Sequence, residues 1–179
     1  MSNLLPRDIV VLNVRVVPLE FHARRAARRK TYHYTVNNYR YVDVFQRHCQ
    51  YHHPTRLDVD AMKQAITCII GEHDFTSFCS TKSKKDSHVR TIHDACIESS
   101  ESAHRIDEGQ VLRIIISGSG FLYHMVRIIA GTLLYIGEGK LKSDDMQRIL
   151  QANDRTQAGP TAMAHGLSLW DVSYDDIVF

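Results

Sequence analysis

The sequence predicts an α+β fold, with a mostly antiparallel sheet and helices packed on one of its faces. Three observations lead to this fold class. Strand-like segments rich in β-branched and aromatic residues are interspersed with helix-like segments, and two of the strands are spaced as a hairpin. One helix-like segment is apolar nearly all round and must therefore be buried. The length of 179 residues suits a single domain over residues 1–179.

Two strands are predicted in the first part of the chain. Residues 9–17 (IVVLNVRVV) are rich in β-branched residues and end at Pro18, which predicts a strand. Residues 31–36 (TYHYTV) alternate with period two and predict a second strand, after which Asn37-Asn38 indicates a turn.

The middle of the chain predicts a helix followed by extended segments. Residues 57–70 read as an amphipathic helix, capped by Asp58 or Asp60 and ended by Gly71. We expect an extended segment at residues 73–81, then a polar loop. Residues 89–98 and 111–118 predict two antiparallel strands joined by an acidic loop.

The last third predicts two helices and a closing strand. Residues 123–136 form the apolar, buried helix, which ends at Gly137. A short helix starts after Ser143, with Asp144 and Asp145 favourably placed in its first turn. Residues 167–174 (LSLWDVSY) predict the final strand.

Composition narrows the class of protein. Apolar residues make up 44% and charged residues 23%, as in a soluble globular protein. No stretch approaches the roughly 20 apolar residues that span a bilayer, and no signal peptide is visible. The four cysteines are scattered and form no CxxC pair, which indicates a reduced, intracellular chain. We expect the cytoplasm, or an organelle if a targeting segment has been removed.

A basic block suggests a polyanionic partner. Residues 22–33 (HARRAARRKTYH) hold five cations and two histidines without an acid, which favours nucleic acid over a merely solvated face. Tyr32 and Tyr34 share one face of their strand, where cations beside an aromatic ring suit base stacking and phosphate contact. The alternative is that the tyrosines belong to the core, which is the better interpretation for one of the two.

Arg127 is the charged residue of the buried helix. An unpaired buried charge is costly, so Arg127 needs a carboxylate or phosphate partner. Gly131 on the same helix face suggests a close approach, and Gly118 and Gly120 would let a ligand near the backbone. A structural ion pair inside the core is the alternative.

Weaker candidates lie elsewhere. The spacing of His48, Cys49, His52 and His53 matches no usual zinc motif, so a polar loop is favoured over a metal site. Likewise, His73 and Asp74 are better explained as the start of a strand than as catalytic residues.

Six segments, in order, resemble one family. They are LPRDIVV, FHARRAARRKTYHYTV, GEHDFTSF, VRTI, GFLYHMVRIIAGTLLYIG and DRTQAGPTAMAHGLSL, and they cover nearly the whole chain. Together they resemble the TruA-type tRNA pseudouridine synthases, in particular the C-terminal half of that fold. The resemblance implies a tRNA partner, isomerisation of uridine to pseudouridine in the anticodon stem-loop, no cofactor, no metal, no membrane and a homodimer.

The resemblance also implies site residues. Arg127 corresponds to the arginine that pairs with the catalytic aspartate, Tyr32 to the tyrosine that stacks on the target uracil, and Leu167 to an apolar residue of the pocket. The residues expected to bind RNA are His22, Arg24, Arg25, Arg28, Arg29, Lys30, Lys82, Lys84, Lys85 and His124.

One departure from the family concerns the nucleophile. The family's aspartate lies in an R-T-D-x-G-V-H type loop, and this chain contains no such loop. We therefore expect a catalytic domain that is inactive on its own and exposes a sheet edge that the other half covers. The alternatives are a non-catalytic RNA-binding module derived from the enzyme, and a purely structural α+β domain.

Overall fold

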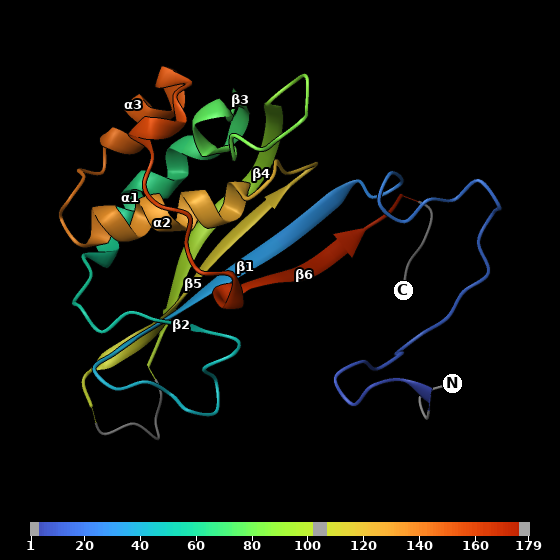
Figure 1. Ribbon diagram of the computed structural model, residues 1–179, viewed down its shortest axis with the longest axis horizontal. Helices are drawn as coiled ribbons and strands as arrows, with labels where there is room; N and C mark the ends of the chain where they lie inside the picture. The colour runs from blue at the N-terminus through green and yellow to red at the C-terminus, as the bar shows by residue number, and fades with distance from the viewer. Residues whose placement is uncertain (1–3, 102–106, 176–179) are drawn as a thin grey trace.

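The computed structural model describes residues 4–101 and 107–175 and confirms the α+β class (Figure 1). The strands are β1 (Arg29–Tyr39), β2 (Tyr51–His52), β3 (Gly71–Asp74), β4 (Val89–Ser100), β5 (Gly109–Gly118) and β6 (Leu167–Ser173). The α-helices are α1 (Val59–Ile66), α2 (Met125–Gly137) and α3 (Asp145–Ala152). Short 3-10 turns are η2 (Thr67–Ile69), η3 (Thr76–Phe78), η4 (Arg155–Gln157) and η5 (Ala164–Gly166).

Strand β1 is the axis of a sheet with the order β2-β1-β5-β4-β3. One side of β1 pairs antiparallel with β5 along its whole length. The other side pairs antiparallel with β6 over its first half and parallel with β2 at Val36 and Asn37. The predicted hairpin of residues 89–98 and 111–118 is confirmed as β4 and β5, which pair antiparallel.

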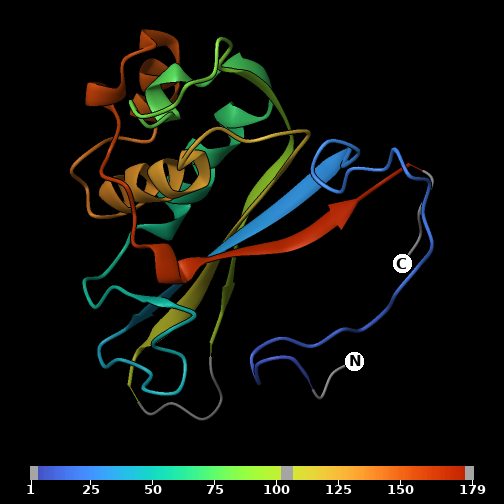
Figure 2. The same ribbon diagram turned by 45° about the vertical axis from the view of Figure 1, so that its right-hand side comes forward.

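The three helices lie on one face of this sheet, as predicted (Figures 1 and 2). Alternate residues of β1 point into the layer between sheet and helices, where Tyr34 and Val36 are fully buried. Helix α2 carries the largest apolar contribution, because all of its residues except Arg127 and Tyr135 are buried. None of the helices in the described part of the chain is long and apolar enough to cross a membrane.

The strand predicted at residues 9–17 is wrong. The segment forms no ladder and runs away from the body of the molecule as an extended arm (Figure 2). Its apolar side chains are exposed, with Leu12 at 93% and Val16 at 102% of full exposure. A β-branched pattern states a preference, but a strand forms only against a neighbouring strand, and no described strand pairs with these residues.

Two further predictions are corrected by local hydrogen bonding. Asn37-Asn38 is no turn but part of β1, because the Asn38 amide donates to the carbonyls of His53 (2.6 Å) and Thr55 (2.8 Å) and ties β1 to the neighbouring segment. Residues 73–81 are extended only to Asp74, whose carboxylate accepts the Thr76 N–H at 2.9 Å and starts the η3 turn.

The helix starts agree better with the sequence. Asp58 caps α1 by accepting the Ala61 N–H at 2.9 Å, and Gly71 adopts a φ of +113° directly after η2. In α2 the helix proper begins at Met125, because His124 adopts a left-handed φ of 62°. A positive φ is rare for a residue with a side chain and costs about 1–3 kcal/mol, so the surroundings must hold it.

The His-rich segment does not assemble a metal site among the described residues. His52 hydrogen-bonds through Nε2 to the carbonyl of Tyr39 at 3.0 Å. Buried His53 places Nε2 3.3 Å from a Glu138 carboxylate oxygen, and Lys140 lies 2.5 Å from the other oxygen. Burial lowers the pKa of His53, and Glu138 opposes that shift only partly.

Candidate functional site

The guanidinium of Arg127 is held by the main chain. Its Nε donates to the carbonyl of Ala162 at 2.7 Å, and the Ala162 N–H donates back to the carbonyl of Arg127 at 3.0 Å. No ion pair among the described residues includes Arg127. The predicted carboxylate partner, and with it the alternative of a structural ion pair, therefore finds no support in the described part of the chain.

The close approach predicted at Gly131 is real, but the chain itself makes it. A Cβ built on Gly131 would lie 1.8 Å from the carbonyl oxygen of Pro160, so residues 159–162 run directly over α2. Gly118 likewise faces the neighbouring strand, because a Cβ built on it would lie 2.6 Å from the carbonyl oxygen of Thr91. Both glycines are thus explained by packing rather than by a ligand.

The two tyrosines of β1 have different surroundings. The sequence favoured a place in the core for one of the two, and Tyr34 is that residue. Tyr34 is fully buried and donates its hydroxyl to the carbonyl of Met163 at 2.9 Å, and burial strongly raises its pKa. Tyr32 is half-buried and meets the ring of Phe121 edge-on, with centroids 4.9 Å apart. Burial raises the pKa of Tyr32, while Arg24 acts in the opposite direction. Tyr32 is therefore the ring that retains accessible surface.

Leu167 opens β6 and lies opposite Tyr34 in the ladder. The chain reaches it from Ala162 through the η5 turn, whose Gly166 packs so tightly on Tyr34 that a Cβ would lie 2.8 Å from Cζ. Arg127, Tyr34 and Leu167 are thus joined by a single continuous segment, and Tyr32 follows on the same face of β1.

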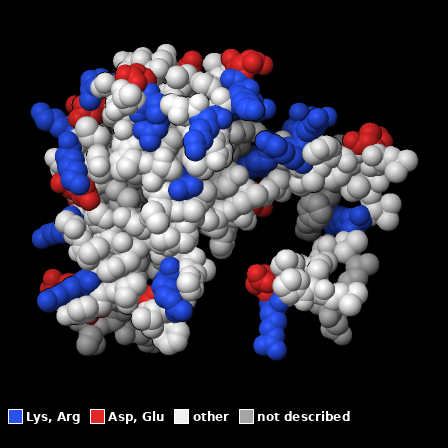
Figure 3. Space-filling view, viewed as in Figure 1, with Lys and Arg blue, Asp and Glu red and all other residues white. Residues whose placement is uncertain are grey.

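The predicted cations fall into two groups on the same side of the molecule. His22, Arg24 and Arg25 are exposed, whereas Arg28 pairs with Asp175 at 2.6 Å. Arg29 donates through Nε to the Ser117 hydroxyl at 2.6 Å, and Lys30 reaches the carbonyl of Arg24 at 3.4 Å. Lysine and arginine side chains gather between the loop of residues 80–88 and the start of β1 (Figure 3).

The second group comprises the exposed Lys82, Lys84 and Lys85. Their loop is anchored beside α2, because the Ser80 N–H donates to the carbonyl of Tyr123 at 3.0 Å. His124 stacks on Tyr123 with centroids 3.9 Å apart. Burial lowers the pKa of His124, and Arg127 and then Lys82 lower it further. The structure therefore brings this loop, His124 and Arg127 to one end of α2.

The sequence analysis did not predict two aromatic contacts. Phe121 packs against Tyr32, and its position within GFLYHMVR was the available signal. Trp170 is 67% exposed and lies flat on His33, with centroids 4.5 Å apart and an angle of 15° between the rings. His33 alternates with Tyr32 and Tyr34 along β1, so this stack lies on the other face of the sheet.

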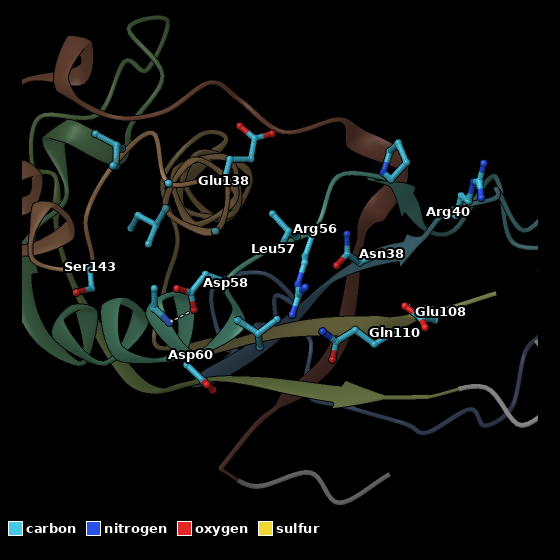
Figure 4. Close-up of a pocket in the computed structure, with 18 of the residues that line it drawn as sticks. Asn38, Arg40, Arg56, Leu57, Asp58, Asp60, Glu108, Gln110, Glu138 and Ser143 are labelled. Atoms are coloured by element: carbon cyan, nitrogen blue, oxygen red, sulfur yellow. Dashed lines mark hydrogen bonds between the residues drawn. The ribbon is translucent and has the colours of Figure 1, made fainter.

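A cavity of about 1100 Å³ lies away from these residues (Figure 4). It includes Asn38, which is six residues along β1 from Tyr32, or about 20 Å. Its wall carries both signs of charge: the cations are Arg40, Arg56 and Lys142, and the acidic residues are Asp58, Asp60, Glu101, Glu108 and Glu138. None of Arg127, Tyr32 or Leu167 lines it. We therefore place the candidate site at α2 and β6, and not in this cavity.

Comparison with known proteins shows the family to which the chain belongs. Residues 65–175 match a family model described as tRNA pseudouridine synthase. The tRNA pseudouridine synthases A of Bacillus licheniformis and Bacillus subtilis are each 47% identical over 176 residues, which is 98% of this chain and 68% of each relative. That of Anoxybacillus flavithermus is 44% identical over 179 residues, with the same coverage. The chain therefore belongs to the tRNA pseudouridine synthase family.

Proposed function

We propose that this chain forms one wall of the active site of a tRNA pseudouridine synthase that acts on the anticodon stem-loop. The observation that carries the proposal is the state of Arg127. Its Nε is fixed by a main-chain carbonyl, and no carboxylate of the described residues neutralises its charge. An arginine in that state offers two amino groups to an incoming carboxylate, the partner that guanidinium binds best.

The role proposed for each residue rests on the family resemblance. A catalytic aspartate, carried by a part of the enzyme that supplies the family's nucleophile loop, pairs with Arg127 and starts cleavage of the bond between base and sugar. The target uridine leaves the helical stack to reach the site. Tyr32 stacks on the freed uracil while it turns, and Leu167 packs against it. The uracil then reattaches through carbon, so the product is an isomer of the substrate.

The part that carries the aspartate has two places to pair with this chain. The outer edge of β6 bears Leu169, which is 51% exposed, and Trp170. The arm of residues 9–17 exposes a strand-forming sequence. An unpaired edge and an unpaired strand both accept β-pairing from another polypeptide. We also propose, from the family resemblance, a homodimeric assembly that works in the cytoplasm.

The tRNA contact surface in this proposal consists of the two cation groups. His22, Arg24 and Arg25 approach from the start of β1, and the loop with Lys82, Lys84 and Lys85 approaches from α2. Phosphate contacts of this kind make binding depend steeply on salt. The expected dissociation constant therefore rises strongly between low and physiological ionic strength.

A reconstitution experiment tests the catalytic proposal. The purified chain is incubated with an anticodon stem-loop RNA, alone and with the N-terminal part of the Bacillus subtilis relative, and pseudouridine is measured. We expect no product from the chain alone and product from the mixture. Arg127→Lys should abolish turnover in the mixture, whereas Arg113→Lys, which alters an exposed pair with Glu98, should not.

A non-catalytic RNA-binding module is the second candidate, favoured because none of the ion pairs among the described residues gives Arg127 a carboxylate partner. It predicts tRNA binding with a steep salt dependence and no turnover in any mixture. A mixture that stays inactive while the chain binds tRNA would select this candidate. Unchanged RNA binding after Arg29→Ala combined with Lys30→Ala would contradict both.

A further inference from the structure

Thr132 connects the middle of α2 to the segment that holds Arg127. Its side chain is fully buried. The hydroxyl donates to the carbonyl of Ile128 at 2.8 Å, one turn earlier, and accepts the N–H of Gly159 at 2.9 Å. Because the hydroxyl donates its single proton to the Ile128 carbonyl, its oxygen can only act as the acceptor for the Gly159 N–H. The contact is therefore a specific anchor for residue 159 on the helix.

The segment that Thr132 anchors packs directly against α2. A Cβ on Gly159 would lie 2.7 Å from the Cα of Thr132, and a Cβ on Gly131 would overlap the Pro160 carbonyl oxygen. Arg155 ties the outer side of the same segment, donating to the carbonyl of Ala158 at 3.3 Å and to the Thr161 hydroxyl at 3.4 Å.

The other end of the segment is the carbonyl that holds Arg127. Ala162 lies three residues beyond Gly159 and makes the two reciprocal hydrogen bonds with Arg127. A guanidinium has its donors in a rigid fork, so fixing Nε fixes the plane in which the two amino groups point. Orientation set before substrate binds lowers the barrier of the chemical step.

We infer that Thr132 is a positioning residue for Arg127, acting through the main chain of residues 159–162. The inference rests on the proposed role of Arg127 and goes beyond it by naming the device that orients the guanidinium. Thr132 touches neither RNA nor the reacting atoms. Its loss should therefore alter the rate of the chemical step rather than the affinity for tRNA.

The direct test observes the Nε–H of Arg127 by NMR in the 15N-labelled chain. Its signal is identified by its absence in Arg127→Lys, and its hydrogen-exchange rate is measured. We expect Thr132→Val to speed exchange about tenfold, the effect of losing roughly one hydrogen bond. Thr132→Ser, which keeps the hydroxyl, should exchange at nearly the wild-type rate.

Two outcomes would overturn the inference. One is a Thr132→Val chain with a lowered melting temperature but an unchanged exchange rate, because Thr132 would then serve stability alone. If Thr132→Val does not fold, the exchange rate is measured in Thr132→Cys instead. The second outcome that would overturn the inference is an exchange rate in Thr132→Cys as slow as in Thr132→Ser. A thiol is the weaker hydrogen-bonding group, so its exchange should lie clearly above that of the serine variant.

In the reconstituted enzyme, Thr132→Val should lower kcat and leave KM unchanged, and Thr132→Ser should restore kcat. A change confined to KM would contradict a positioning role. If mixing the parts gives no turnover at all, the proposed function fails, but the exchange measurement still decides whether Thr132 orients Arg127.

Discussion

Ser77, in the segment GEHDFTSF, is a small residue whose replacement should be costly. Its side chain is fully buried between η3, α3 and the start of η4. The hydroxyl donates to the carbonyl of Ile149 at 2.6 Å and accepts the N–H of Asp154 at 2.8 Å. Ser77→Ala leaves both main-chain groups without this partner. At about 1–3 kcal/mol for each buried polar group left unpaired, the two groups together would cost about 2–6 kcal/mol. Because the contact with Asp154 is only partly buried, we expect a loss in the lower part of that range, about 2–4 kcal/mol.

The assay is urea unfolding of the purified chain with a thermal scan beside it. For a chain of this length the loss corresponds to a fall in Tm of about 4–16 °C. Ser87→Ala is the matched control, because Ser87 is exposed and its hydroxyl accepts a long hydrogen bond from the Val89 N–H, at 3.3 Å. If Ser77→Ala were no more destabilising than Ser87→Ala, the anchoring role that its two hydrogen bonds assign to Ser77 would be refuted.

Three further predictions concern charge and burial. Arg24→Ala with Arg25→Ala should weaken tRNA binding about uniformly across sequences and reduce the slope of log affinity against log salt by about 1–2, measured by filter binding. Burial lowers the pKa of His53, so its contribution to stability is complete above pH about 6.5 and is lost as the pH falls through the lowered folded value. Between pH 7.5 and 5.5 the free energy of unfolding, measured in urea, should therefore fall less for His53→Gln than for the wild type. Equal falls in the two proteins would contradict this. Tyr34→Phe leaves the Met163 carbonyl without its donor and should cost about 1–2 kcal/mol in the same unfolding assay, and no measurable loss would disprove it.

Residues that act through local patterns were predictable from the sequence. The alternation of TYHYTV identified β1, and the apolar run around Met125 identified α2 as buried, because both signals are periodic within one element. The cap at Asp58 was predictable for the same reason, since capping depends on residues a few positions apart.

Long-range contacts were not predictable. The sequence indicated a close approach at Gly131, but only the fold shows that Pro160, 29 residues later, makes it. The partner of Arg127 was expected to carry charge and is instead a neutral carbonyl, which no side-chain pattern encodes. Residues 9–17 mark the opposite limit: the strand predicted there is wrong, because strand propensity alone does not form a strand and none of the described strands pairs with this segment.

The arm of residues 9–17 has a consequence for handling the chain in the cell and in the test tube. Its nine residues contain no proline and one charged residue, Arg15, and they combine high β-propensity with apolar side chains that are mostly exposed. Segments of this composition stack into cross-β fibrils when left unoccupied. An extended chain of this kind is also the preferred site for proteases to cut. Production of this chain by itself therefore favours aggregation and nicking at the arm, and co-expression with a pairing strand is the remedy.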